Sequence, residues 1–216
     1  MSGSSSSDTD HEKTAELVRN LGAIYGPLAW WSDDPELVII GAMLTQQTRW
    51  EHVEQALDKL SAAGLLSLPA LTVADLAVLE QAVYSTGFYR VKARRLKALA
   101  SHLIGVYGGV DGMRRCPTED LRVDLLSCEG VGNETADSIL CYGFSRCTFV
   151  IDAYTNRICS CAGVSLKDSR LKCLFEEVLP ASVAAYQDTH AHMVEFGKEN
   201  CQRQRCEQCW IRNLNG

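Results

Sequence analysis

The stretch Gly130-Val131-Gly132 contains two residues that an anion could approach closely. Glycine has no Cβ and adopts positive φ readily, so the backbone N–H groups of such a turn are accessible to a phosphate. Apolar residues at helical spacing lie on both sides of the turn, which predicts one helix over 118–128 and a second that carries Ala136, Ile139 and Leu140 on one face. The partial positive charge at the N-terminus of the second helix adds to the attraction. The pattern predicts a clamp on a nucleic-acid backbone; an ordinary helical hairpin with structural glycines is the alternative.

A single carboxylate, Asp152, follows the apolar run Phe149-Val150-Ile151, twenty residues after Gly132. A carboxylate at the start of a helix commonly caps it, and this is the simple structural role for Asp152. A carboxylate can also stabilise developing positive charge or activate a water molecule. The second role requires a substrate-binding site, which only the surrounding helices can provide.

The hydrophobic pattern predicts helices only, since no segment alternates as a strand would. An almost wholly apolar helix over 36–45 should be central, and a basic helix over 89–107 carries five cations and no acid within 90–97. A helix over 71–83 should begin at Thr72, with Asp75 completing an acidic capping box. The other expected helices span 13–25, 49–62, 155–162, 169–178 and 181–196. The sequence therefore predicts an all-α protein.

The composition is that of a globular protein with a sizeable core: 216 residues, 46% hydrophobic and 22% charged. The apolar runs are too short to cross a bilayer and no secretory signal is visible, so we expect a cytoplasmic, nucleoid-associated protein with reduced thiols. The net charge of −6 argues mildly against a nucleic-acid partner. Part of the acid, however, lies in a Ser-rich tail over 1–12 that we expect to be disordered, and a local basic helix can still contact phosphates.

The hairpin and the carboxylate together resemble the helix-hairpin-helix DNA glycosylases of the endonuclease III superfamily. Their pattern is a Gly-Val-Gly-x-x-Thr-Ala hairpin followed, about twenty residues on, by Val-Asp-x-x-x-x-Arg. The resemblance implies a two-lobed fold with a DNA-binding cleft between the lobes. The lobes would be a central domain over 35–147, which ends in the hairpin, and a second domain built from 13–34 plus 148–216. It also implies that Asp152 is catalytic, stabilising the oxocarbenium-like charge as the base leaves and activating the attacking water.

Glu134 departs from the pattern of the bifunctional members, which carry a lysine two residues after the second hairpin glycine. A carboxylate cannot form the Schiff base by which that lysine expels the base and cleaves the strand. The resemblance therefore implies a monofunctional glycosylase with Glu134 beside the base pocket. An acidic residue in the first turn of a helix is also favourable by itself, and the two roles are compatible.

The tryptophans favour one branch of the superfamily, the 3-methyladenine DNA glycosylase III type, which holds an N-alkylated purine between aromatic rings. Trp30, Trp31 and Trp50 flank the apolar helix and match the pocket aromatics of that branch, although plain core packing is the commoner role of tryptophan. An N3-alkylated purine is cationic, so an electron-rich indole face attracts it. The similarity spans roughly residues 22–200 and is strongest over 134–142.

The resemblance also implies contacts to DNA. In the wider family the side chain at the position of Gln46 enters the gap left by the flipped nucleotide; a helix-end residue bonding a free backbone group is the alternative for Gln46. The predicted DNA-binding set comprises Gln46, Lys92, Arg95, Gly130, Val131, Gly132 and Thr135.

Three cysteines near the C-terminus, Cys201, Cys206 and Cys209, are candidate metal ligands. Endonuclease III relatives bind a [4Fe–4S] cluster there with four cysteines spaced C-x6-C-x2-C-x5-C, but here the first gap is shorter and Asn215 stands at the fourth position. Three interpretations stay open: a remnant without metal, a cluster whose fourth ligand is another cysteine, or a zinc site with a remote ligand. No fourth ligand can be assigned from the sequence, and the remaining cysteines are expected to be small buried side chains.

The predicted function is removal of alkylated purines, with 3-methyladenine the first choice, from damaged double-stranded DNA by a monomeric monofunctional glycosylase. The enzymatic alternative is an endonuclease III-like glycosylase for oxidised pyrimidines or mismatched bases. The non-enzymatic alternative is a catalytically inactive helix-hairpin-helix DNA-binding protein. Turnover of single-lesion duplexes separates these alternatives.

Overall fold

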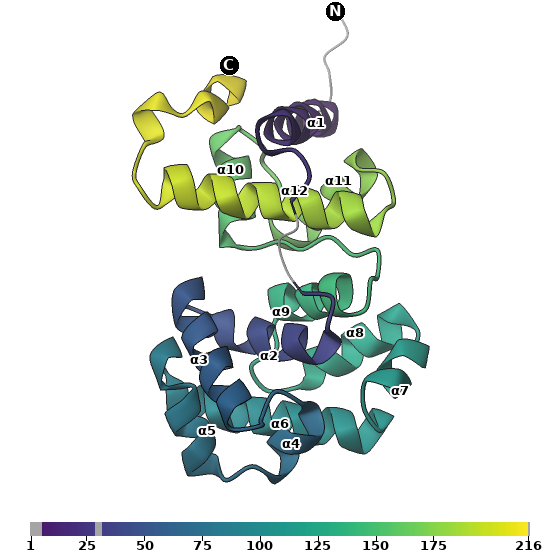
Figure 1. Cartoon of the computed structure of the whole chain (residues 1–216). Helices are drawn as coiled ribbons and strands as arrows, with labels where there is room; N and C mark the ends of the chain where they lie inside the picture. Colours follow the sequence, from purple (N-terminus) through teal and green to yellow (C-terminus); the bar gives the residue numbers. More distant parts are fainter. Residues whose placement is uncertain (1–5, 29–31, 216) are drawn as a thin grey trace, which may run out of the picture. The chain divides into compact units, whose positions relative to one another are not determined.

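The computed structural model describes residues 6–28 and 32–215, and every regular element within these ranges is helical (Figure 1). The prediction of an all-α protein is confirmed. In the described segments no helix has both the length and the apolar character that a bilayer crossing requires.

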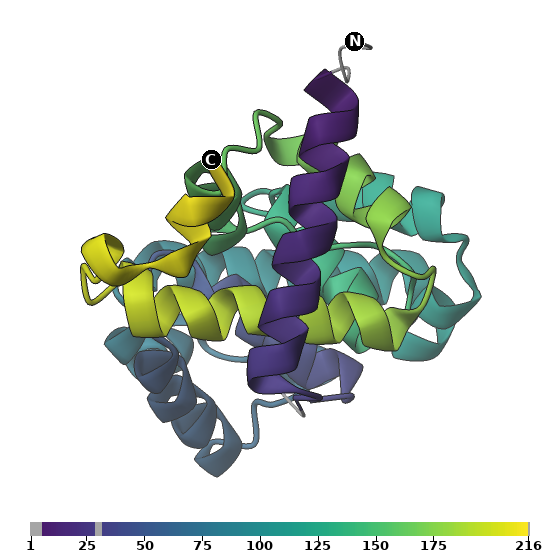
Figure 2. The same cartoon turned by 90° about the horizontal axis from the view of Figure 1, so that it is seen from above.

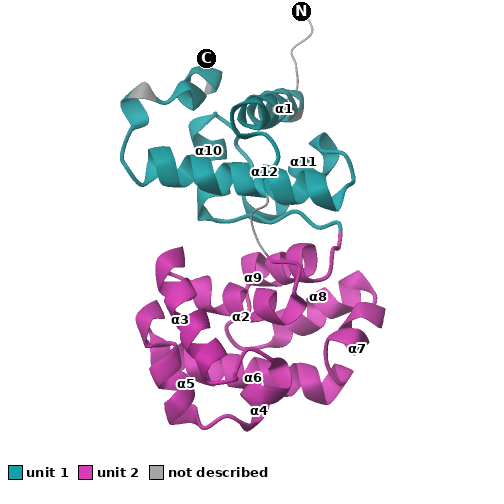
Figure 3. Cartoon of the chain, viewed as in Figure 1, with its two compact units in different colours: residues 1–30, 147–216 teal, residues 31–146 magenta. Residues whose placement is uncertain are grey.

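The chain divides into two compact units (Figure 3): residues 1–30 with 147–216 form unit 1, and residues 31–146 form unit 2. The sequence predicts that the chain passes from one domain to the other between residues 34 and 35 and again between residues 147 and 148. Unit 1 contains α1 (Ser6–Tyr25), α10 (Ala153–Cys161), α11 (Asp168–Val178), α12 (Val183–Phe196), η3 (Gly197–Cys201), η4 (Cys206–Gln208) and η5 (Trp210–Asn215). Unit 2 contains α2 (Pro35–Thr45), α3 (Trp50–Ala62), α4 (Leu68–Val73), α5 (Leu76–Ala82), η1 (Tyr84–Thr86), α6 (Tyr89–Tyr107), α7 (Val110–Arg115), α8 (Thr118–Ser127), α9 (Asn133–Ser138) and η2 (Ile139–Gly143).

Helix α2 is the centre of unit 2, as its apolar sequence predicts. Pro35 occupies its first turn, and the Asp34 side chain caps it by accepting from the backbone N–H of Glu36 at 2.9 Å. Its buried residues pack within the core of unit 2, and α3, α6, α9 and η2 all contact it. The central position places the end of α2, and hence Gln46, beside the hairpin of α8 and α9.

The helix predicted over 71–83 is two helices, α4 and α5, because capping side chains start each one separately. Ser67 caps α4 and accepts from the backbone N–H of Ala70 at 3.3 Å. Ala74 is extended, and Asp75 caps α5 by accepting from Ala77 at 2.7 Å. Asp75 therefore begins a helix instead of completing the predicted capping box.

Unit 1 joins the two ends of the chain, because α1 packs against α11 and α12. Figure 2 shows α1, in purple, running across α12, in yellow-green. Leu17 and Leu21 on α1 are fully buried. Elsewhere in this core the Phe149 and Phe175 rings stack with centroids 4.3 Å apart.

The predicted disordered tail over 1–12 is not found for residues 6–12, since α1 begins at Ser6. A buried side chain explains the difference: Asp10 is 4% exposed and accepts from the Ser165 hydroxyl at 2.6 Å and from the Ser165 backbone N–H at 3.1 Å. The polar composition predicted a segment exposed to solvent. It could not reveal that the Asp10 carboxylate binds Ser165, which lies 155 positions away in the sequence.

Candidate active site

The hairpin between α8 and α9 has the backbone that its two glycines permit. Gly130 adopts φ +86°, in the left-handed region. Gly132 has φ −98° and open space where a Cβ would lie. Between them Val131 is buried, and its N–H donates to the carbonyl of Cys128 at 3.1 Å. The turn thus fixes one residue in the core and leaves Gly132 exposed at the start of α9.

An ion pair that the sequence analysis missed holds the two hairpin helices together. Arg122 on α8 donates from Nε to Asp137 Oδ1 at 2.7 Å and from Nη2 to Asp137 Oδ2 at 3.1 Å. The same Nη2 donates to Asn133 Oδ1 at 3.0 Å. Asp137 is 2% exposed, so this two-bond pairing satisfies a buried charge. The available signal was a charged residue, Asp137, between the predicted core residues Ala136 and Ile139.

Gln46 is bound to the hairpin. Its Nε2 donates to the Gly130 carbonyl at 2.8 Å and to Thr135 Oγ1 at 3.0 Å. Gln46 is the C-terminal cap residue of α2, so this arrangement matches the alternative of a helix-end residue bonding a backbone group. Entry of its side chain into DNA would require these two bonds to break, and that role stays a prediction.

Arg95 on α6 also lies against the hairpin. Its Nε donates to Glu129 Oε1 at 3.1 Å, and its side chain passes so close to Gly130 that a Cβ there would lie 2.6 Å from Arg95 Cδ. The pair is solvent-exposed, so its contribution to stability is small. Breaking the pair would therefore cost little, and phosphate contact by Arg95 stays a prediction.

Lys92 does not present its charge to DNA in this structure, contrary to the prediction. The residue is 6% exposed, and its Nζ donates to the carbonyls of Leu44 at 2.8 Å and Thr86 at 2.9 Å. Burial lowers the pKa of Lys92 to about 8. The buried ammonium instead joins α6 to the last turn of α2 and to η1.

The predicted base-pocket residues are only partly described. Trp30 and Trp31 lie outside the described residues. Trp50 begins α3, where it is half-buried and packs against the core of unit 2, in line with the structural alternative for this tryptophan. Glu134 lies in the first turn of α9 and is exposed.

Asp152 is the N-cap residue of α10, which is the structural role foreseen for it. Its Oδ1 accepts from the backbone N–H and from the hydroxyl of Thr155, each at 2.7 Å. Asp152 is 8% exposed. Burial lowers the pKa of the nearby His190, and the negative charge of Asp152 opposes that shift. The carboxylate is thus held in one position inside unit 1, close enough to His190 to act on its pKa.

The predicted site residues are divided between the units. Asp152 and the C-terminal cysteines belong to unit 1, and the other described members of the predicted set belong to unit 2. Within unit 2 the structure brings together Gln46, Arg95, Thr135 and the hairpin glycines.

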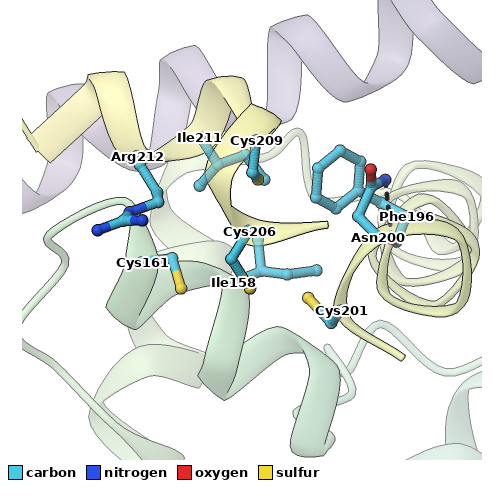
Figure 4. A pocket seen from close by; sticks show the side chains of 9 residues that line it. All are labelled: Ile158, Cys161, Phe196, Asn200, Cys201, Cys206, Cys209, Ile211 and Arg212. Carbon is cyan, nitrogen blue, oxygen red and sulfur yellow. Dashed lines mark hydrogen bonds between the residues drawn. The ribbon is translucent and has the colours of Figure 1, made fainter. Parts of the chain in front are cut away.

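A fourth cysteine accompanies the three near the C-terminus. Cys161, at the end of α10, lines the same space as Cys201, Cys206 and Cys209 (Figure 4). The space between these cysteines is partly open to solvent. Burial raises the pKa of the Cys201 thiol, as does negative charge on the other three cysteines, and Arg157 lowers it. In the described part of the chain no group of three or more His, Cys, Asp or Glu residues is placed to hold a single metal ion.

Comparison with known proteins identifies the family. The model of the "HhH-GPD superfamily base excision DNA repair protein" family matches residues 40–180. A protein of Methanocaldococcus jannaschii with the provisional name DNA repair glycosylase is 38% identical over 210 residues, which cover 94% of this chain and 96% of the relative. Endonuclease III of Thermotoga maritima is 30% identical over 83% of this chain and 82% of its own length.

Solved structures agree at the level of the fold. The H. pylori 3-methyladenine DNA glycosylase MagIII, bound to 1,N6-ethenoadenine, matches with a TM-score of 0.75 and 25% identity, over 88% of this chain and 97% of that one. A non-covalent endonuclease III–DNA complex matches with a TM-score of 0.79 and 22% identity, over 94% of each chain. The chain therefore belongs to the HhH-GPD superfamily of base excision DNA repair proteins, as a DNA glycosylase of the endonuclease III superfamily.

Proposed function

We propose that this glycosylase hydrolyses the N-glycosidic bond of alkylated purines, 3-methyladenine first among them, in double-stranded DNA, and that it leaves the strand intact. Two separate observations support the proposal: Asp152 is a fixed, buried carboxylate in unit 1, and Glu134 stands in unit 2 at the hairpin position where bifunctional relatives carry lysine. The first residue can support hydrolysis, and the second cannot form a Schiff base.

Asp152 acts on the sugar in this proposal. As the C1′–N bond breaks, the electron pair of this bond leaves with the base, and positive charge develops on the deoxyribose. A buried carboxylate stabilises that charge more strongly than one in water, because the surrounding medium screens it less. Water then attacks C1′ and gives up a proton, which Asp152 can accept. The two bonds from Thr155 keep the carboxylate in place throughout.

The preference for alkylated purines follows from leaving-group chemistry and from the aromatic residues. A cationic purine leaves as a neutral base, so it needs no general acid. Trp30, Trp31 and Trp50 are the proposed source of the stacking faces that attract the cation. The similarity to H. pylori MagIII, a 3-methyladenine DNA glycosylase, supports the same substrate class.

Oxidised pyrimidine is the second candidate, and the 30% identity with Thermotoga maritima endonuclease III supports it. Duplexes that each contain one lesion, either 3-methyladenine, 1,N6-ethenoadenine or an oxidised pyrimidine, separate the two. Faster release of the oxidised pyrimidine would replace the proposed substrate class.

The test of Asp152 is the Asp152→Asn variant, because asparagine can still accept the cap hydrogen bond but carries no charge. We expect release of 3-methyladenine from methylated duplex DNA to fall by at least about 100-fold. Asp111→Asn, in the first turn of α7 and exposed, is the matched control and should retain wild-type activity. Substantial activity in a folded Asp152→Asn variant would contradict the catalytic assignment. Trapping of a covalent adduct with DNA by borohydride would contradict the monofunctional assignment.

A further inference from the structure

Four thiols surround one space in unit 1, and they come from different parts of the chain. Cys161 ends α10, Cys201 ends η3, Cys206 begins η4, and Cys209 directly follows η4. Cys161 is separated from Cys201 by forty positions of sequence, so no local spacing motif connects the two. Their convergence is a result of the fold (Figure 4).

We propose that Cys161 is the fourth protein ligand of a [4Fe–4S] cluster whose other ligands are Cys201, Cys206 and Cys209. Such a cluster binds four cysteine thiolates, each to a different iron. The C-terminal segment offers only three, since Asn215 stands where relatives of the endonuclease III type have the fourth cysteine. Cys161 supplies the missing thiolate from another helix.

The walls of the space fit such a group. Ile158, Phe196 and Ile211 line it with apolar side chains, which limit the access of water to a cluster. Arg212 also lines it, and Arg157 is close enough to act electrostatically on Cys201. Four thiolates around a cluster leave a net negative charge, which these two guanidinium groups would offset. When the thiols bind iron they release their protons.

With Cys161 in place of a fourth C-terminal cysteine, the cluster would be bonded directly to the helix that Asp152 caps. Helix α10 has Asp152 as its N-cap and Cys161 as its last residue. A cluster bound through Cys161 would tie the C-terminal segment to this helix, about 14 Å along its axis from Asp152 at 1.5 Å per residue. In relatives whose four ligands all lie in the C-terminal segment, no ligand would connect the cluster to this helix.

The experiment measures iron and acid-labile sulfide in the full chain, purified without oxygen and reconstituted with ferrous iron and sulfide. We expect about four of each per wild-type chain, together with visible charge-transfer absorption. In Cys161→Ala we expect either loss of the cluster or conversion to a three-iron form with about three irons, detectable by electron paramagnetic resonance after oxidation. Neither readout depends on excision of a base, so failure here is separate from failure of the proposed function.

Cys159→Ala is the matched control, because Cys159 lies on the same helix, is fully buried, and does not line the space. It should keep the iron content and spectrum of the wild-type chain. Far-ultraviolet circular dichroism checks that both variants are folded, and Cys161→Val, which fills the space left by the thiol and offers no ligand atom, is the substitute if Cys161→Ala is not. A wild-type chain that binds only zinc or no metal after reconstitution, or a Cys161 variant with unchanged iron, sulfide and spectrum, would overturn the proposal.

Discussion

Two cations of unit 2 show that neighbouring side chains of one basic stretch can either lie at the surface or bind main-chain carbonyls. Lys92 and Arg95 belong to the same basic stretch, yet Lys92 is buried with two carbonyl partners whereas Arg95 pairs with an exposed glutamate. The basic stretch predicted a phosphate-binding face, but the packing of α6 against α2 decides which cation points inward. Only Arg95 remains a candidate for phosphate contact among these two.

The burial of Lys92 predicts a specific dependence of stability on pH. The pKa of Lys92 falls from 10.5 to about 8 in the folded chain. Between these pH values the unfolded chain binds a proton that the folded chain does not, so the free energy of unfolding should rise with pH. In Lys92→Met this contribution to the slope should vanish. Urea denaturation at a series of pH values from about 7.5 to 10.5 measures it.

Lys59→Met is the control for the Lys92 prediction, because Lys59 is exposed on α3. The control should keep the slope of the wild-type chain, since other groups that titrate in this range are common to all three proteins. Equal slopes in Lys92→Met and in the wild-type chain would show that the ammonium is not buried as described.

The site residues that could be predicted are those whose role is local. Asp152 follows an apolar run and begins a helix, and the structure confirms it as the N-cap. Cys161 and the Arg122–Asp137 pair could not be assigned, because their partners are chosen by how helices pack. Sequence spacing carries no information on such contacts.

At the scale of elements, the two glycines of the hairpin differ in why glycine is needed. Gly130 is needed for the backbone, because its φ of +86° is strained for any residue with a Cβ. Gly132 has an ordinary φ and open space beside it, so the fold alone does not require glycine there. Close approach of a phosphate is a physical reason for the second glycine.

Alanine substitutions test this division. Gly132→Ala should change the free energy of unfolding by no more than about 0.5 kcal/mol, yet weaken binding to duplex DNA at least about tenfold, because a Cβ blocks hydrogen bonds to a charged phosphate. Gly130→Ala should instead lose roughly 1–2 kcal/mol of stability through its positive φ. Urea denaturation and fluorescence anisotropy with a labelled duplex measure the two effects. Wild-type affinity in Gly132→Ala would exclude that residue from the phosphate contact.

Helix boundaries were predictable where the hydrophobic pattern and the cap agree. The helix predicted over 36–45 is α2, which begins one residue earlier, at Pro35, and is capped by Asp34. The segment 71–83 shows the limit, since Thr72 and Asp75 could each begin a helix and only the structure shows that Asp75 does. The hydrophobic pattern is the same whichever of these two residues caps the helix, so the pattern alone cannot locate the helix start.

At the scale of the whole chain, unit 1 depends on contacts between segments that are far apart in sequence. Residues 1–30 and 147–216 form it together, and α1 packs on α11 and α12. The composition of the N-terminal segment suggested a solvated tail, whereas its helix is part of the core from Asp10 onward. The first helix should therefore be as important for stability as any helix within unit 1.

Two substitutions on α1 measure that importance. Leu17 is fully buried and Ile24 is 55% exposed on the same helix. Substitution of each by alanine therefore removes a side chain of similar size from a different environment. Leu17→Ala should lower the free energy of unfolding by about 2–5 kcal/mol, because it removes apolar contacts and leaves a cavity between α1 and its neighbours. Ile24→Ala should lower it by no more than about 0.5 kcal/mol. Urea unfolding followed by circular dichroism compares them. Equal small effects would mean that α1 contributes little to unit 1, whereas the expected difference would show that the two ends of the chain stabilise one core.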